Sequence, residues 1–191
     1  MKTEPTIPSN SSVSSVSSVA KGFEVTQAET PTQLTQVREL FLEYAQSLGF
    51  SLCFQNFDKE LASLPGDYAP PEGRLLLAEY EGQLAGCVAL HKLESGICEM
   101  KRLYLRPRMR GKGLGLALAN HIITEARQIG YQRMRLDTVE PVMKDAVAMY
   151  RKLGFQEIAP YCANPMSGVI YMELELKSRP DFRHNGCPTS P

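Results

Sequence analysis

A run of seven residues in the second half of the chain has the composition of a phosphate-binding loop: Arg110, Gly111, Lys112, Gly113, Leu114, Gly115 and Leu116. Three glycines at alternate positions let the backbone turn sharply and approach a ligand closely, because no Cβ atom stands in the way. An apolar strand pattern precedes the run and a helical pattern follows it. The first N–H groups of that helix lack intrahelical acceptors, so the run predicts a binding site for a diphosphate.

Two common glycine-rich loops do not fit this spacing. A Walker A loop places Ser or Thr directly after Gly-Lys, whereas Lys112 is followed by Gly113. A dinucleotide fingerprint, G-x-G-x-x-G, meets Leu116 or Leu118 where its last glycine should stand. The spacing that does fit is Arg-x-x-Gly-x-Gly, formed by Arg110, Gly113 and Gly115.

This spacing resembles the coenzyme A loop of the GNAT superfamily of N-acetyltransferases, which is usually written Q/R-x-x-G-x-G/A. The flanking segments agree with it. Residues 98–107 look like the superfamily's central strand and residues 134–139 like its fifth strand. Residues 146–155 are similar to its A-x-x-L-Y-x-x-x-G-F helix end, with Met149 in the Leu position. The resemblance covers roughly residues 23–177.

The resemblance implies a GNAT-type α/β fold, with a mixed, mostly antiparallel central sheet, helices on both faces and a splayed central strand pair. The local patterns agree with that order. We expect a strand at 23–27, a helix starting after Thr30-Pro31, a short helix at 57–64, a hairpin of 75–80 with 83–93, a helix from 113 to 129, a strand at 133–138, a helix from 142 to 153 and two final strands.

By the same resemblance the co-substrate is acetyl-CoA. Its pyrophosphate would take N–H groups from Arg110 to Leu116, and a backbone N–H of the central strand would stabilise the oxyanion. The pantetheine arm would lie along Leu103, Tyr104 and Leu105. The family often has an Asn seven positions before its tyrosine, but Met143 stands there in this chain, so that contact is not carried over.

Two side chains are candidate catalysts. Tyr150 matches the family tyrosine that protonates the departing thiolate; a phenol is about 1.5 units less acidic than a thiol, so it would have to lie beside the sulfur. Glu99 stands eleven positions before Arg110, where some histone acetyltransferases of the superfamily carry a base. The alternative for Tyr150 is a core aromatic. The alternatives for Glu99 are an exposed strand residue or a partner of Lys101 or Arg102, with a water chain as the base.

The composition limits the classes of partner. The 191 residues suffice for one domain with a full core, and 21 Lys plus Arg balance 21 Asp plus Glu. A neutral chain gives no reason to expect nucleic acid or a membrane as partner. Five cysteines without a C-x-x-C pair predict neither disulfides nor zinc, and the histidines, isolated from each other and from any carboxylate cluster, predict no metal. Positive charge gathers near the glycine loop, at Lys101, Arg102, Arg106, Arg108, Arg110 and Lys112.

The domain is expected to span residues 23–177. Residues 1–22 form a Ser/Val-rich tract without the apolar segment of a secretory signal and predict a disordered tail. Residues 178–191, rich in Pro and polar side chains, predict a flexible C-terminal tail. No segment reaches the length of a membrane span, and together with the unpaired cysteines this predicts a cytoplasmic protein.

The function that these features predict is an acetyl-CoA-dependent N-acetyltransferase acting on a primary amine of a small molecule or amino acid. The alternatives are a protein N-terminal or lysine acetyltransferase and a non-catalytic acyl-CoA-binding sensor module. Segments 47–69 and 161–168 are expected to shape the acceptor site, and homodimer formation is left open. Four aromatic residues either line an apolar acceptor pocket or belong to the core: Phe50, Phe54, Phe57 and Tyr68.

Overall fold

The computed structural model describes residues 22–49 and 56–176. The tails expected at 1–22 and 178–191 lie outside the described residues apart from Gly22, as do Phe50 and Phe54. Within the described ranges, no helix is both long and apolar enough to cross a lipid bilayer.

The described residues form seven strands, four α-helices and two short 3-10 helices, in an order that agrees with the sequence-based prediction. In chain order they are β1 (Phe23–Gln27), α1 (Pro31–Ser47), α2 (Phe57–Ser63), η2 (Gly66–Tyr68), β2 (Arg74–Tyr80), β3 (Gln83–Glu94), β4 (Ile97–Leu105), η3 (Pro107–Met109), α3 (Leu114–Ile129), β5 (Arg133–Val139), α4 (Lys144–Leu153), β6 (Gln156–Ile158) and β7 (Val169–Glu175).

The strands form one sheet in the order β1-β2-β3-β4-β5-β7-β6. Every neighbouring pair is antiparallel except β4 and β5, which run parallel. A parallel pair needs a long crossover connection, and α3 supplies it here. The expected mixed, mostly antiparallel sheet is therefore confirmed.

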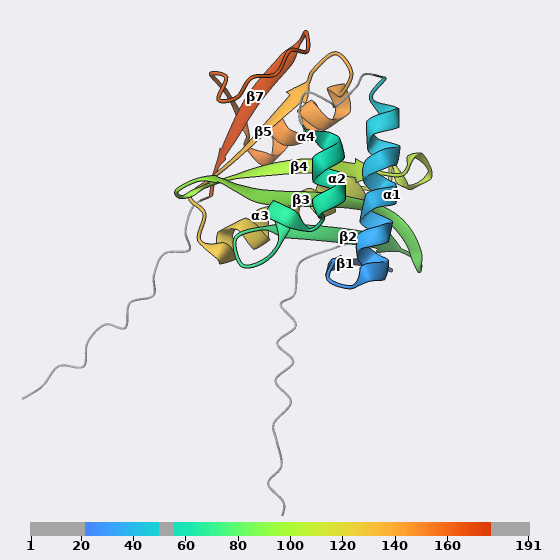
Figure 1. Ribbon diagram of the computed structural model, residues 1–191. Helices are drawn as coiled ribbons and strands as arrows, with labels where there is room; N and C mark the ends of the chain where they lie inside the picture. The colour runs from blue at the N-terminus through green and yellow to red at the C-terminus, as the bar shows by residue number, and fades with distance from the viewer. Residues whose placement is uncertain (1–21, 50–55, 177–191) are drawn as a thin grey trace, which may run out of the picture.

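The parallel pair separates soon after it begins. β4 and β5 pair at three positions, the last of which joins Glu99 to Arg135. β4 continues to Leu105 and β5 to Val139 without pairing with each other again, and the two strands diverge (Figure 1). The splayed central pair expected from the resemblance is confirmed. Beyond Glu99, no described strand pairs with this edge of β4.

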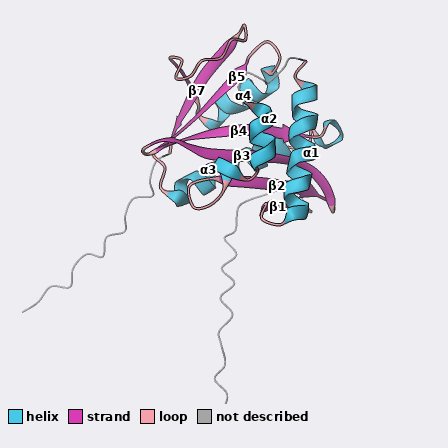
Figure 2. Ribbon diagram, in the orientation of Figure 1, coloured by secondary structure: helices cyan, strands magenta, loops and turns pink. Residues whose placement is uncertain are grey.

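Helices cover both faces of the sheet (Figure 2). α3 and α4 pack on one face, where Ile122 and Tyr150 share a core with Met134. α1 and α2 pack on the other face, where Phe41 and Phe57 share a second core with residues of β2 and β3. Phe57 is thus a core residue, which was one of the two alternatives considered for it.

The start of α1 follows from local chemistry, whereas the start of α4 does not. Thr30 caps α1 by accepting the N–H of Gln33, and the Gln33 side chain accepts the N–H of Thr30 in return. α4 begins at Lys144 rather than at the expected residue 142. The N–H groups of Val142 and Met143 both donate to the carbonyl of Val139, so a turn precedes the helix.

Candidate functional site

A groove of about 530 Å³ runs beside the second half of β4. One wall consists of Leu103, Tyr104 and Leu105, where the resemblance places the pantetheine arm, together with Arg110, the first residue of the expected pyrophosphate loop. Residues 141–146, at the start of α4, form the opposite wall, and the last turn of α1 contributes to the rim. Met143, where the family often has Asn, is one of the lining residues, so a thioether replaces the amide at that wall.

The glycine loop begins where Arg110 lines this groove. Gly111 and Gly113 have φ angles of 77° and 76°, in the left-handed region that favours glycine, and a Cβ atom at either position would meet nothing within 4 Å. Gly113 is the N-cap of α3 and supplies no side-chain cap. Within the described chain, the N–H groups of residues 111–116 have no backbone or side-chain acceptor. Six consecutive donors are therefore available to an anion.

Arg110 departs from the prediction in one respect. Its backbone N–H donates to the carbonyl of Pro107 at 3.2 Å, so this donor is already used within the loop. Its side chain turns back as well, because Nε donates to the carbonyl of Leu105 at 3.1 Å. The predicted set of seven backbone donors is therefore too large by one, although Arg110 still lines the groove.

A narrower cavity of about 50 Å³ lies where β4 and β5 diverge. It shares lining residues with the groove, Leu103 and Met143 among them, so the two hollows adjoin. Its walls bring together residues that are far apart in the sequence: Lys101 from β4, Asp137 from β5 and Tyr150 from α4. The splay of the two strands thus creates the space in which a side chain can meet a ligand.

Tyr150 is 5% exposed and lines this cavity. Among the described residues its hydroxyl has no hydrogen-bond partner, although its ring packs against Phe155 at 5.6 Å between centroids. Burial, with the nearby Tyr44 and Asp137, raises the pKa of Tyr150 above its ordinary value. The phenol therefore stays protonated throughout the physiological range and has a proton to donate.

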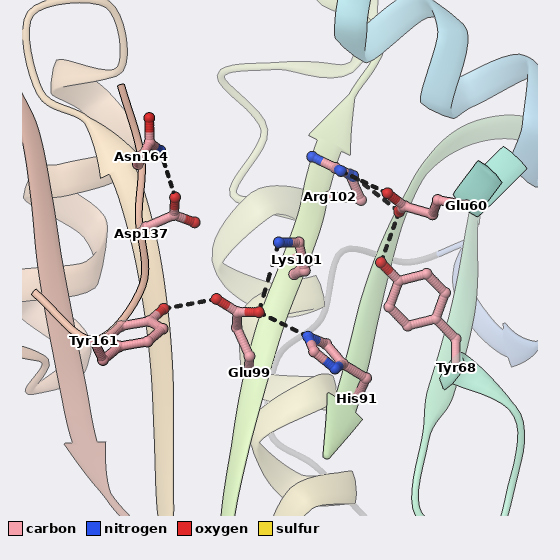
Figure 3. Close-up of polar contacts among 9 residues, drawn as sticks. All are labelled: Glu60, Tyr68, His91, Glu99, Lys101, Arg102, Asp137, Tyr161 and Asn164. Atoms are coloured by element: carbon pink, nitrogen blue, oxygen red, sulfur yellow. Dashed lines mark hydrogen bonds and ion pairs between the residues drawn. The ribbon is translucent and has the colours of Figure 1, made fainter. Parts of the chain in front are cut away.

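Glu99 lies on β4 and is almost fully enclosed, with 5% of its side chain exposed. Its two oxygens accept hydrogen bonds from Tyr161 Oη and from His91 Nε2, both at 2.7 Å, and Lys101 Nζ lies 3.6 Å away (Figure 3). Burial alone would raise the pKa of Glu99, but the hydrogen bond from His91 and the charge of Lys101 outweigh it and lower the pKa to about 2. The expected partnership with Lys101 is present, and so firmly held a carboxylate is a weak base.

His91 is isolated from carboxylates in the sequence but not in the fold. It faces Glu99 across the β3–β4 hairpin, because the register pairs these two residues directly. A two-residue turn at Ser95-Gly96 that continued in regular register would instead have placed His91 opposite Met100. An irregularity between Lys92 and Glu94 shifts the pairing by one residue. Such a bulge leaves no clear mark in the sequence, which is why the contact was missed.

The basic cluster seen in the sequence is largely neutralised by the two helices on that face. Arg102 forms a bidentate pair with Glu60 of α2, at 2.6 and 3.0 Å, and Glu60 also accepts from Tyr68 at 2.6 Å. Arg106 binds Glu43 of α1 at 2.8 Å. Only part of the cluster thus remains to attract an anionic ligand, and Arg102 and Arg106 hold helices to the sheet.

Sequence reasoning also missed Asp137. This residue lies on β5 beyond the last pair with β4, and its Oδ2 accepts from Asn164 Nδ2 at 2.7 Å. The alternation of β5 was visible in the sequence, with Met134 and Leu136 on the core face and Arg135 and Asp137 on the other. That alternation showed which face Asp137 takes but not that the neighbouring strand would move away from it.

Comparisons with known proteins agree with this architecture. The family model described as the acetyltransferase (GNAT) family matches residues 34–155. An uncharacterized N-acetyltransferase of Schizosaccharomyces pombe is 42% identical over 171 residues, which cover 88% of this chain and 97% of the relative. The uncharacterized N-acetyltransferase YjgM of Escherichia coli is 33% identical over 159 residues, covering 80% and 92% of the two chains.

A solved structure has the same fold. The structure of yncA from Salmonella typhimurium with its cofactor acetyl-CoA matches with a TM-score of 0.61 and 19% identity, over 84% of this chain and 97% of that one. At this level of identity the likeness concerns the fold.

Proposed function

This chain belongs to the acetyltransferase (GNAT) family, and on that premise we propose that it transfers an acetyl group from acetyl-CoA to the primary amine of a small molecule or amino acid. The observation that carries the proposal is the cavity at the divergence of β4 and β5. It adjoins a groove lined by Arg110, the first residue of the glycine loop, and it is lined by a buried tyrosine whose hydroxyl has no hydrogen-bond partner among the described residues.

The residues of the groove fit acetyl-CoA. The donors of residues 111–116, the open space above Gly111 and Gly113 and the helix end behind them suit a diphosphate. The free edge of β4 beside Leu103 offers backbone groups to the amides of a pantetheine arm. When bound, acetyl-CoA supplies a thioester that an amine can attack without prior activation of the acyl group.

For transfer by direct attack, the main task of the protein is to hold the amine against the thioester carbonyl in the geometry of attack. The amine nitrogen forms a bond to the acyl carbon and loses a proton, while the carbon–sulfur bond breaks and the sulfur gains one. Tyr150 is the proposed donor of that second proton, since it lines the cavity and its protonated hydroxyl has no partner among the described residues. A free N–H on the unpaired edge of β4 would stabilise the oxyanion.

Glu99 remains a candidate base by its position in the sequence, but its contacts favour another role. Both of its oxygens are used, and its low pKa makes it a poor acceptor for the proton of an ammonium group. We propose that Glu99 positions Lys101 and Tyr161 around the cavity rather than taking a proton itself.

The test is the release of free thiol from acetyl-CoA by the purified chain, with amino acids, other small amines and short peptides as acceptors. Tyr150→Phe should lower kcat by about 10²-fold, because it removes the proton donor, while acetyl-CoA binding measured by calorimetry is retained. Tyr131→Phe is the matched control: this buried tyrosine donates to the carbonyl of Glu72, and it should leave kcat unchanged.

Two outcomes would contradict the proposal. Tight binding of acetyl-CoA without release for any acceptor would favour an acyl-CoA-binding module. Release with peptides but with no small amine would favour a protein acetyltransferase.

A further inference from the structure

We infer that the acceptor is a small zwitterion, an amine with a carboxylate close by as in a free amino acid, and that Lys101 binds its carboxylate while Asp137 binds its ammonium group. The inference rests on the proposed function and concerns the acceptor side of the same cavity. It would explain why two opposite charges line a narrow space without pairing with each other.

Lys101 is a largely enclosed ammonium group with unused donors. Its side chain is 18% exposed, and its ionic partner is Glu99 at 3.6 Å, which is too long for a hydrogen bond. In the described part of the chain Lys101 Nζ makes no hydrogen bond. An ammonium group that is largely enclosed is stabilised by an anionic acceptor, and Glu99 already accepts hydrogen bonds from His91 and Tyr161. A carboxylate of the ligand would complete the coordination of Lys101.

Asp137 is the complementary charge. One of its oxygens accepts from Asn164, and among the described residues the other has no donor. Figure 3 shows this second oxygen directed across the gap toward β4, where the amine of Lys101 lies on the side facing the gap. Both residues line the same cavity, yet no ion pair joins them within the described ranges.

The neighbouring charges do not compete for the ligand. Arg102, which also lines the cavity, is held by Glu60 through two hydrogen bonds. Arg135 is held by Glu173 at 2.7 Å and by Glu94 at 2.9 Å. Among the charged residues that line the narrow cavity, Lys101 and Asp137 therefore keep hydrogen-bonding groups that no described residue occupies, one of each sign.

The size of the site favours a compact acceptor. The cavity at the splay measures about 50 Å³, and Lys101 also lines a second cavity of about 270 Å³ toward α2. Polar side chains border this second cavity, including His91 and Tyr68. A carboxylate at Lys101 would place the amine in the narrow cavity and leave the larger one for a polar side chain. A peptide N-terminus carries an amide in place of that carboxylate and would leave Lys101 without its partner.

The experiment compares each of a panel of amino acids with its own carboxamide, using thiol release from acetyl-CoA by the full chain. The free acid should be preferred by about 10- to 100-fold in kcat/KM, since a hydrogen bond to a charged group is lost with the amide. Lys101→Met should raise KM for the acids by a similar factor and leave the carboxamides unchanged. Asp137→Asn should slow both kinds of acceptor.

Lys92→Met is the matched control, because Lys92 is half exposed on β3 and pairs with Glu72 at 2.6 Å; it should preserve the preference. Equal rates with acids and carboxamides in the wild type, or an equal loss for both in Lys101→Met, would overturn the inference while the proposed function stands. Absence of release with every amine would overturn the proposed function itself. If Lys101→Met does not fold, the wild-type comparison decides alone.

Discussion

Glu99 organises the polar side chains next to the cavity. Because its carboxylate is ionised and accepts only, the imidazole of His91 must donate to it through Nε2, and the hydroxyl of Tyr161 must donate as well. Arg135 lies over the ring of Tyr161 at 5.3 Å, which extends the network to β5. A single carboxylate thus fixes one imidazole, one phenol and one ammonium group around the candidate acceptor site.

This arrangement predicts how stability depends on pH. The pKa of Glu99 is about 2 in the folded chain and 4.5 for an ordinary glutamate, so the folded state favours the ionised form. The resulting stabilisation is fully present above about pH 4.5 and is lost as the pH falls toward 2. Glu99→Gln should lower the free energy of unfolding by about 2 kcal/mol at pH 7. It should also make the free energy of unfolding depend less on pH between 4.5 and 2.

Denaturant unfolding at a series of pH values measures the pH dependence of the free energy of unfolding. Glu125→Gln serves as the comparison, since that carboxylate lies on the other face of the sheet, in a partly exposed pair with Arg74. Parallel curves for the wild type and Glu99→Gln below pH 4.5 would show that Glu99 is not the titrating group.

Among the elements, β4 has the irregularity that shapes the site. Val88 of β3 faces both Arg102 and Leu103 of β4, and Arg102 has a φ of 58°. This bulge places Lys101 and Arg102 on the same face of the sheet, although neighbours in a regular strand point to opposite faces. One therefore reaches the cavity beside Glu99 while the other pairs with α2.

The N-terminus of α3 gives a prediction with a control in the same helix. Gly113 and Gly130 flank α3 with φ angles of 76° and 102°, and a Cβ atom at either position would meet nothing within 4 Å. Either Gly→Ala change should therefore cost about 1 kcal/mol of stability through backbone strain. Gly113→Ala should in addition weaken acetyl-CoA binding, because its Cβ atom enters the space above the free N–H groups.

Calorimetric titration of acetyl-CoA and thermal unfolding of both variants separate the two effects. The same affinity in Gly113→Ala and Gly130→Ala would contradict a binding role for the loop.

At the scale of the whole molecule, the two helical layers are attached to the sheet in different ways. α3 and α4 pack through an apolar core, whereas α2 is a short helix whose apolar contacts are reinforced by an ion pair. The side chains of Arg102 and Glu60 are 3% and 13% exposed, so both charges have left water and depend on each other. The wall of the second cavity that α2 provides depends on this pair.

Removing either Glu60 or Arg102 alone should therefore destabilise the fold more than replacing the whole ion pair by uncharged side chains would. Glu60→Gln alone should cost about 3–5 kcal/mol, because it leaves the guanidinium group of Arg102 without its carboxylate. The double variant Glu60→Gln/Arg102→Met should be less destabilised than the sum of the single variants. Chemical unfolding of the wild type, the two single variants and the double variant gives a double-mutant cycle. Hydrogen exchange over residues 57–63 reports whether α2 has loosened. If the losses in free energy of unfolding of the two single variants add up to that of the double variant, the two charges act independently.

The sequence by itself determined the elements and the place of the glycine loop, because both depend on neighbours along the chain. Capping at Thr30, the glycines at 111 and 113 and the apolar periodicity of α3 are local requirements, and each was confirmed. The resemblance supplied the splay of β4 and β5, and it directed attention to Tyr150.

Only the tertiary structure decided which charges meet at the cavity. His91 reaches Glu99 through a shifted hairpin register, and Lys101 faces Asp137 across two strands that are joined through α3. Such contacts depend on bulges and on the divergence of strands, whose backbone geometry is set by packing and leaves no period in the sequence. The residues were therefore visible from the start, whereas their partners could be known only once the chain was folded.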